Sequence, residues 1–259
     1  MSSIPITTPL NLYKNYLEAQ GLTSKDVDTM EIQLLSPGEV SSWLGFKSFT
    51  SGIMIPYPYS DGQYFRVRML GGRADAAARK QPKYLSPKGS GCAPPYLPEL
   101  RDWAALRVDV GQPLVITEGE FKAYVACKLL PPEVAVLGIG GVEMQETLLT
   151  SGFEWKGRAV HICFDHDGDL AGYKPQVGVA LGKLCATLEG RGAKVSVLNI
   201  RLTAEAEEGE KMGLDDYLRG GGDWGRLAMT ATSPPERSEE RRVGKECAQL
   251  CRSRWSPYH

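Results

Sequence analysis

The segment PLVITEGEFKAYVACKLL, residues 113–130, joins a short apolar run to a helical pattern. The run PLVIT has the length and composition of a buried strand, and EFKAYVACKLL suits a helix that the following Pro131-Pro132 ends. Glu118 and Gly119 stand at the junction. A strand that leads directly into a helix is typical of proteins built around a parallel sheet.

The alternation of strand and helix continues downstream. The strand-like runs VAVLGIGG, RAVHICF and KVSVLNI are separated by the helix-like VEMQETLLTSGF and VGVALGKLCATLEGRGA. This order indicates a parallel sheet covered on both faces, and such sheets bind ligands beyond the carboxyl ends of their strands. Acidic residues stand at two of these predicted ends, Glu118 after the first strand and Asp165 after the third.

Three aspartates follow the third predicted strand: Asp165, Asp167 and Asp169. Carboxylates a few Å apart raise one another's pKa unless a cation lies between them, and Mg²⁺ prefers carboxylate oxygens. The alternative is a solvated loop in which aspartates serve as turn residues. A calcium-binding loop is excluded, because Leu170 and Gln176 stand where that loop needs Gly and Glu.

The first hundred residues lack this alternation. We expect residues 10–35 to be helical, a short helix with Pro37 near its start, and a β-hairpin in GIMIPYPYSDGQYFRVRML with its turn at Asp61-Gly62. Residues 71–98, rich in Gly, Pro, Ala, Lys and Arg, are predicted to form an extended, mobile loop.

The bulk properties limit the classes of function. The chain has 259 residues and a net charge of −1, so no overall basic field announces a nucleic-acid partner, although a local basic groove would suffice. No signal peptide and no apolar run of membrane-spanning length is present, so a cytoplasmic protein without a membrane partner is predicted. The tail from about residue 231 resembles vector-derived tails and is expected to be disordered and non-native; a basic arm for nucleic acid is the alternative.

The order of Glu118-Gly119, the glycine turn of VLGIGG and the Asp-x-Asp of FDHDGD resembles the TOPRIM domain of bacterial-type primases, topoisomerases and related nucleases. KMGLDDYL, residues 211–218, is similar to a segment of TOPRIM-like domains in phage and plasmid primase-helicase proteins, a family of unknown function. GIMIPYPYSDGQYFRVRM and PKYLSPKGSGCAPPYLP resemble the part of bacterial-type primases just before TOPRIM. The resemblance covers about residues 10–220.

This resemblance implies an α/β fold: a TOPRIM-like Rossmannoid parallel sheet flanked by helices, preceded by a smaller α+β primase-like subdomain. The implied boundaries are 1–105 for the N-terminal subdomain, where the template binds, and 106–230 for the TOPRIM-like domain, with the tail at 231–259.

The resemblance also implies roles for the acidic residues. Glu118 would be a metal ligand or general acid/base, and Asp165 and Asp167 would be ligands of Mg²⁺ or Mn²⁺. Asp169 would be an outer ligand or part of the loop surface. Asp215 and Asp216 would add a further ligand, or Asp215 would cap the helix of DDYL.

Basic residues are the candidate phosphate contacts. Arg66 and Arg68 alternate along one predicted strand and therefore share a face. Lys83 and Lys88 lie in the loop with Tyr84, and this mixture suits a single-stranded template, although a solvated surface is the alternative. Lys122 would reach substrate or pair with Glu118 across one helical turn. The glycine turn Gly138–Gly141 would bind phosphate through backbone N–H groups or serve as a tight turn.

The implied function is metal-dependent nucleotidyl or phosphoryl transfer on nucleic acid, as in a primase of phage or plasmid replication. Its partners would be single-stranded DNA, nucleoside triphosphates and a separate replicative helicase, since the chain has no GxxxxGK[ST] motif. The alternatives are a TOPRIM nuclease and a catalytically inactive nucleic-acid-binding module. FDHDGDL also resembles haloacid-dehalogenase-type phosphatases, but Asp169 departs from that motif and two strand–helix units precede it.

Overall fold

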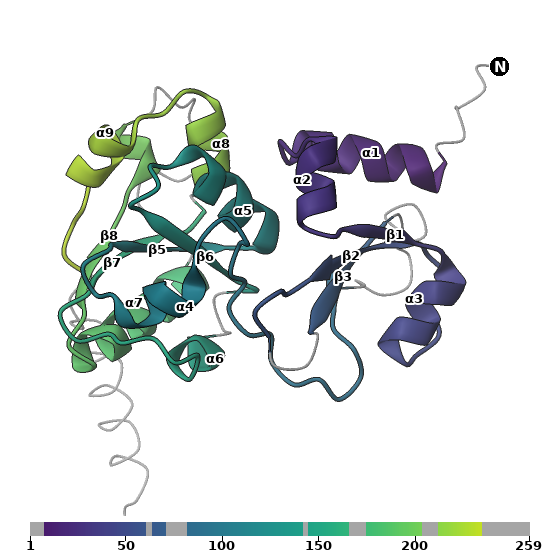
Figure 1. The fold of residues 1–259 in the computed structure, drawn as a ribbon, viewed down its shortest axis with the longest axis horizontal. Helices are drawn as coiled ribbons and strands as arrows, with labels where there is room; N and C mark the ends of the chain where they lie inside the picture. The colour runs from purple at the N-terminus through teal and green to yellow at the C-terminus, as the bar shows by residue number, and fades with distance from the viewer. Residues whose placement is uncertain are drawn as a thin grey trace, which may run out of the picture.

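The computed structural model describes residues 8–60, 64–70, 82–141, 145–165, 175–203 and 212–234. The N-terminal part is a four-stranded antiparallel sheet of order β1-β2-β3-β4 with three helices (Figure 1). Its elements are α1 (Pro9–Ala19), α2 (Ser24–Thr29), β1 (Gln33–Leu35), α3 (Pro37–Leu44), β2 (Gly52–Pro56), β3 (Phe65–Met69) and β4 (Tyr84–Leu85). The predicted hairpin is confirmed, because β2 pairs with β3 from Gly52↔Met69 to Pro56↔Phe65. Its expected turn, Asp61-Gly62, lies outside the described residues.

Two expectations for this part need correction. The helical prediction for residues 10–35 extended too far: α1 ends at Ala19, Gly21 has φ +76°, and β1 begins at Gln33. The predicted loop 71–98 contains a strand, because β3 offers its edge to Tyr84 and Leu85. The short helix at Pro37 is confirmed, and Ser36 caps it through the backbone N–H of Glu39.

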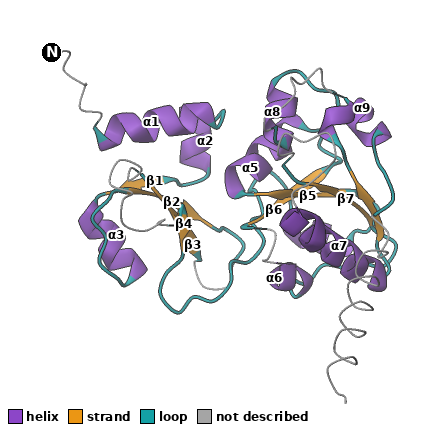
Figure 2. Ribbon diagram, turned by 180° about the vertical axis from the view of Figure 1, so that it is seen from behind, coloured by secondary structure: helices purple, strands orange, loops and turns teal. Residues whose placement is uncertain are grey.

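The C-terminal part contains the predicted parallel sheet, in the order β6-β5-β7-β8. Its elements are α4 (Trp103–Val108), β5 (Leu114–Glu118), α5 (Glu120–Leu129), β6 (Ala135–Ile139), α6 (Gln145–Leu149), β7 (Ala159–Cys163), α7 (Pro175–Gly190), β8 (Lys194–Val197), the 3₁₀ helix η1 (Ile200–Leu202), α8 (Leu214–Arg219) and α9 (Trp224–Met229). Helices α5, α8 and α9 lie on one side of the sheet and α6 and α7 on the other (Figure 2). The predicted fold class is confirmed.

The strand order creates a switch point between β5 and β7. From β5 the chain crosses to β6 on one side, and the later strands β7 and β8 are added on the other. Neighbouring helices diverge at such a point and leave room for a ligand beyond the carboxyl ends. Glu118 and Asp165 stand at the ends of these two strands, so the topology brings them to one edge.

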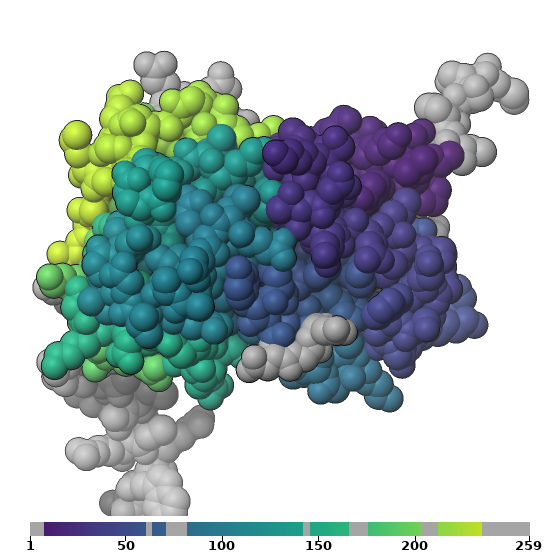
Figure 3. Space-filling view, in the orientation of Figure 1, coloured from purple at the N-terminus to yellow at the C-terminus, as the bar shows by residue number. Residues whose placement is uncertain are grey.

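The two parts share a hydrophobic core. Leu17, Ile53 and Ile55 of the N-terminal part belong to the same buried cluster as Phe121 and Tyr124 of α5. A second cluster fills the other side of the parallel sheet. Its members include Trp103, Leu106, Leu137, Phe153, Trp155, Ile162 and Leu184. In the space-filling view the two parts abut without a gap between α5 and the N-terminal helices (Figure 3).

The expected domain limits meet two structural features. Helix α4 crosses the expected 105/106 boundary, and its buried side chains Trp103 and Leu106 pack in the C-terminal core, so we propose a boundary before Trp103. Thr232, near the expected start of the tail at 231, exchanges two backbone hydrogen bonds of 3.0 Å with Val197, so we propose that the tail begins after it. Within the described ranges, no helix combines the length and hydropathy that a bilayer crossing requires.

Candidate active site

The Glu-Gly turn after β5 is fixed by close backbone packing. Gly119 has φ +94°, which favours glycine, and its N–H donates to the Ile139 carbonyl at 2.8 Å. A Cβ at Gly138 would lie 2.5 Å from the Gly119 carbonyl oxygen. Gly138 therefore allows the end of β6 to pack against the turn that presents Glu118. Two roles were expected for this glycine, phosphate binding and a tight turn. The close contact with the Gly119 carbonyl supports the tight turn.

Three side chains from separate segments meet beyond the strand ends. Asp165 follows β7, Asp215 lies in the first turn of α8, and Lys122 lies in the first turn of α5. The Lys122 ammonium donates to both carboxylate oxygens of Asp165. A Cβ at Gly213 would lie 2.6 Å from Asp215 Oδ1 and 3.1 Å from both Asp165 Oδ1 and Lys122 Nζ. Gly213 thus leaves space at the centre of an acidic cluster, which we define as Asp165, Asp215 and Lys122.

Asp215 carries the most perturbed carboxylate of this cluster. Its side chain is buried, at 3% exposure, and Oδ1 has no hydrogen-bond partner among the described residues. Burial, then Asp216 and Asp165, raise its pKa to about 6, against the opposing charge of Lys122. The shift shows that burial and the neighbouring carboxylates together outweigh the positive charge of Lys122 at Asp215.

The cluster fits a cation in part. An unpartnered buried carboxylate oxygen beside a second aspartate is a donor set that Mg²⁺ or Mn²⁺ prefers. Against this, Lys122 already supplies one positive charge at Asp165. Within the described residues, no three His, Cys, Asp or Glu side chains gather closely enough to hold a metal. Asp167 and Asp169, two of the expected ligands, lie outside those residues.

The structure bears on two alternatives that the sequence left open. Asp216, rather than Asp215, caps α8, because its Oδ2 accepts the N–H of Gly213 at 3.1 Å. Asp215 instead points into the cluster. Lys122 was expected to reach substrate or pair with Glu118; the structure shows it in an ion pair with Asp165, which follows β7 and lies 43 residues away in the chain.

A buried ion pair joins the N-terminal sheet to the turn after Glu118. Arg66 of β3 donates to Glu120 Oε1 at 2.7 Å and to the Gly140 carbonyl at 3.0 Å. The Tyr57 hydroxyl donates to the same Glu120 oxygen at 2.6 Å. Burial, and then Glu120, raise the pKa of Tyr57 well above its usual value, which keeps this hydroxyl a donor.

This network corrects the expectation for Arg66. Its guanidinium is buried and engaged, so in this structure it holds two elements together rather than facing a template. The sequence analysis did not single out Glu120 or Tyr57. The only feature of the sequence that could have identified Glu120 is its position. It is the second acidic residue of the EGE motif and the first residue of α5, a helix whose buried face is otherwise apolar.

Arg68 shares a face with Arg66, as predicted. The Arg66 and Arg68 guanidinium carbons lie 4.8 and 5.1 Å from the ring centroid of Tyr84, and Arg68 is also 4.9 Å from that of Tyr16. Tyr84 is thus covered by cations rather than open for stacking on a base. Lys83 and Lys88, the other expected phosphate contacts, are exposed.

Comparisons with known proteins concern the fold that carries this site. The model of a domain of unknown function, DUF3854, matches residues 103–223. The structure is similar to the catalytic core of the E. coli primase, with a TM-score of 0.55, 19% identity, and 86% of this chain and 74% of that chain covered. It is also similar to the RNA polymerase domain of Mycobacterium tuberculosis primase DnaG, with a TM-score of 0.54, 16% identity, and coverage of 88% and 78%.

The chain has the fold of a primase catalytic core. A DnaG catalytic domain solved with single-stranded DNA is a further neighbour, with a TM-score of 0.50, 19% identity, and coverage of 89% and 76%. No curated protein matches the sequence. At these identities the likeness is one of fold, and the chemistry has to be argued from the residues themselves.

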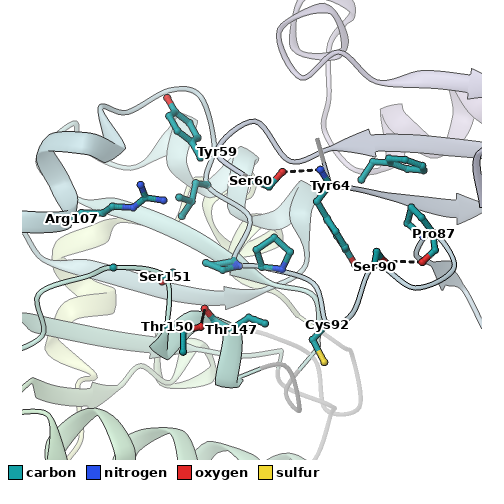
Figure 4. A pocket seen from close by; sticks show the side chains of 15 residues that line it. Tyr59, Ser60, Tyr64, Pro87, Ser90, Cys92, Arg107, Thr147, Thr150 and Ser151 are labelled. Atoms are coloured by element: carbon teal, nitrogen blue, oxygen red, sulfur yellow. Dashed lines mark hydrogen bonds between the residues drawn. The ribbon is translucent and has the colours of Figure 1, made fainter. Parts of the chain in front are cut away.

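A cleft of about 790 Å³ lies between the two parts of this primase-core fold (Figure 4). Tyr59, Tyr64 and Cys92 line it from the N-terminal part, and Arg107 and Thr147 from the C-terminal part. The cleft is separate from the acidic cluster, none of whose residues lines it. The cleft therefore gives no support to a site at the strand ends, and that site is supported by the arrangement of its carboxylates, Asp165 and Asp215.

Proposed function

We propose that this chain is a TOPRIM protein of phage or plasmid replication that performs metal-dependent, primase-like nucleotidyl transfer. The observation that carries the proposal is the meeting of Asp165 and Asp215 at the edge of the sheet where β5 ends in Glu118. This is the place at which open α/β sheets bind ligands. A buried carboxylate with a raised pKa, such as Asp215, is typical of functional sites.

Each acidic residue has a role in the proposal. Asp165 and Asp167 are ligands of Mg²⁺ or Mn²⁺, Asp215 adds a ligand from α8, and Asp169 is an outer ligand. Glu118 is a further ligand or the general acid/base. The bound metal would stabilise charge on the phosphates. Asp216, as the α8 cap, positions Asp215 and is not itself a ligand.

The basic residues divide into two groups. Lys83 and Lys88 are exposed and contact the template phosphates of single-stranded DNA. Arg66 positions the Glu118 turn through Glu120 and Gly140, and Arg68 holds Tyr16 and Tyr84. Lys122 leaves Asp165 when metal binds and contacts the phosphates of the nucleoside triphosphate. A separate replicative helicase is the proposed protein partner.

A priming assay tests this function. The protein is incubated with single-stranded DNA, nucleoside triphosphates and Mg²⁺, and oligonucleotide products are expected. Glu118→Gln and Asp165→Asn should each abolish them, whereas Glu133→Gln, at an exposed acidic residue, should not. Shortening of the DNA instead of synthesis would identify a nuclease and contradict the proposal.

A second candidate is a nucleic-acid-binding module without catalysis. The Lys122–Asp165 ion pair favours it, because a lysine that already neutralises Asp165 reduces the need for a metal. This candidate predicts DNA binding that is unaffected by removal of divalent metal, with neither synthesis nor cleavage. Binding measured with and without a chelator separates the two candidates.

A further inference from the structure

Three large aromatic side chains are exposed on the N-terminal part. Trp43, Phe46 and Phe49 keep 51, 39 and 77% of their surface exposed. They come from the C-terminal end of α3 and the loop that leads to β2. We call this set the aromatic surface. Single exposed apolar residues are common, but three aromatic rings within seven residues indicate a contact site.

A shallow hollow lies within the aromatic surface. Its volume is about 250 Å³, and its lining includes Phe46 and Phe49, with Met69, Pro82 and Leu85 beside them. This is smaller than the roughly 300–1,000 Å³ of sites for drug-sized ligands, and it suits one planar ring. The hollow offers apolar and aromatic contact without a demanding set of polar partners.

The surroundings of the aromatic surface are positively charged. The Lys47 ammonium lies 4.8 Å from the ring centroid of Phe49. The backbone N–H of Lys88 donates to the Leu44 carbonyl at 2.9 Å, and this hydrogen bond holds Lys88 beside the end of α3. The segments that build this region, residues 37–51 and 82–98, contain three lysines and one acidic residue, Glu39. A polyanion is therefore the complementary ligand.

We propose that the aromatic surface binds single-stranded nucleic acid, with bases stacked on Phe46, Phe49 and Trp43 and with phosphates on Lys47 and Lys88. Aromatic rings interleaved with basic residues bind single strands in this way without sequence preference. An apolar protein partner would gain nothing from the excess of lysines over acidic residues.

This site is distinct from the acidic cluster. Met69 and Leu85 pack on the α3 side of the N-terminal sheet, whereas Arg66 reaches Glu120 on the other side. Helix α3 lies at the end of the molecule remote from the parallel sheet (Figure 1). The aromatic surface would hold a strand far from the reacting end. It shares Lys88 with the proposed template contacts, but it does not depend on the proposed chemistry.

Binding of a fluorescently labelled oligothymidylate, followed by anisotropy, tests the site. Phe49→Ala should weaken binding by roughly tenfold, as expected for one lost base stack. Lys47→Gln should lower the slope of log affinity against log salt by about 0.7, whereas Phe49→Ala should leave that slope unchanged. Met229→Ala is the matched control, because Met229 is 84% exposed on α9 in the other part of the molecule.

The outcomes separate this inference from the proposed chemistry. Asp165→Asn should remove synthesis and keep oligothymidylate binding, whereas the double variant Phe46→Ala/Phe49→Ala should lose binding with an unchanged melting temperature. Unchanged affinity in the folded double variant would overturn the inference. Unchanged affinity together with altered sedimentation would also overturn it and would assign the surface to a contact between proteins.

Discussion

The Lys122 ammonium binds both carboxylate oxygens of Asp165, so α5 delivers a positive charge to the strand end at which a metal is proposed. The lysine and a divalent cation would then compete for the same oxygens. We predict that Lys122→Gln strengthens Mn²⁺ binding by roughly tenfold or more, since a charge-assisted hydrogen bond contributes about 1.5–3 kcal/mol. Electron paramagnetic resonance of free Mn²⁺ measures this without an activity assay.

Lys128 offers a matched control for this competition. It lies on the same helix as Lys122 and forms an ion pair of 2.8 Å with Asp26 of α2. Lys128→Gln should leave Mn²⁺ affinity unchanged. Weaker Mn²⁺ binding by Lys122→Gln would show that the lysine supports the metal site instead of competing for it.

The raised pKa of Asp215 predicts a pH dependence of stability. The folded-state pKa is about 6, above the value near 3.9 of an unfolded aspartate, so the folded state holds the proton more tightly. The free energy of unfolding should therefore fall as pH rises from about 4 to 6, by about 3 kcal/mol in total from this residue. Thermal unfolding across this range measures the change.

Asp215→Asn isolates that contribution. The variant should be more stable than the parent above pH 6, because no charge is buried, and the difference should vanish near pH 4. Asp223→Asn would be a poor control, since Asp223 caps α9. Exposed Asp109 or Glu133 is preferable. A constant difference between the variant and the parent across the range would contradict the assigned pKa.

The Arg66–Glu120 pair should be important for stability. Arg66→Met leaves Glu120 buried without its cation, and removal of one partner of a buried ion pair costs about 3–5 kcal/mol. Adding Glu120→Gln should restore part of that loss. Arg68→Met, which removes only ring contacts, should cost about 1 kcal/mol. Urea unfolding of the parent, Arg66→Met, Glu120→Gln and the double variant measures the coupling, and simple additivity would show that the two residues do not interact.

Gly138 should resist substitution where Gly141 does not. A Cβ at Gly138 would lie 2.5 Å from a backbone oxygen, whereas none of the surrounding atoms lies within 4 Å of a Cβ at Gly141. Gly138→Ala should therefore cost about 1–3 kcal/mol of unfolding free energy, and Gly141→Ala less than about 0.5 kcal/mol. Equal melting temperatures for the two variants would argue against close packing at the Glu118 turn.

The sequence was sufficient for the parallel sheet because its strands are short apolar runs that end in glycine or acidic residues. That pattern alone places Glu118 and Asp165 at strand ends. It did not reveal that Lys122 pairs with Asp165 or that Arg66 pairs with Glu120. Both pairs join residues far apart in the chain, and local periodicity carries no information on such contacts.

The errors in the N-terminal part have a related cause. Residues 33–35 were expected to be helical, but they pair with β2, which offers hydrogen bonds to an extended chain. Tyr84 and Leu85 form a strand within a Pro- and Gly-rich segment because β3 has a free edge beside them. In both cases a tertiary partner outweighed the local preference. Whether the role of Asp215 was capping or coordination also depended on how α8 docks.

The common core of the two parts limits which fragments of this protein can be expressed alone. The recognised segment, residues 103–223, includes Phe121 and Tyr124 but excludes Leu17, Ile53 and Ile55, which cover them. Expressed alone, that segment would expose the hydrophobic surface around Phe121 and Tyr124 to water and would be expected to aggregate. Recombination between relatives that exchanged this segment would also have to exchange the matching N-terminal residues. The unit that is inherited together is therefore larger than residues 103–223.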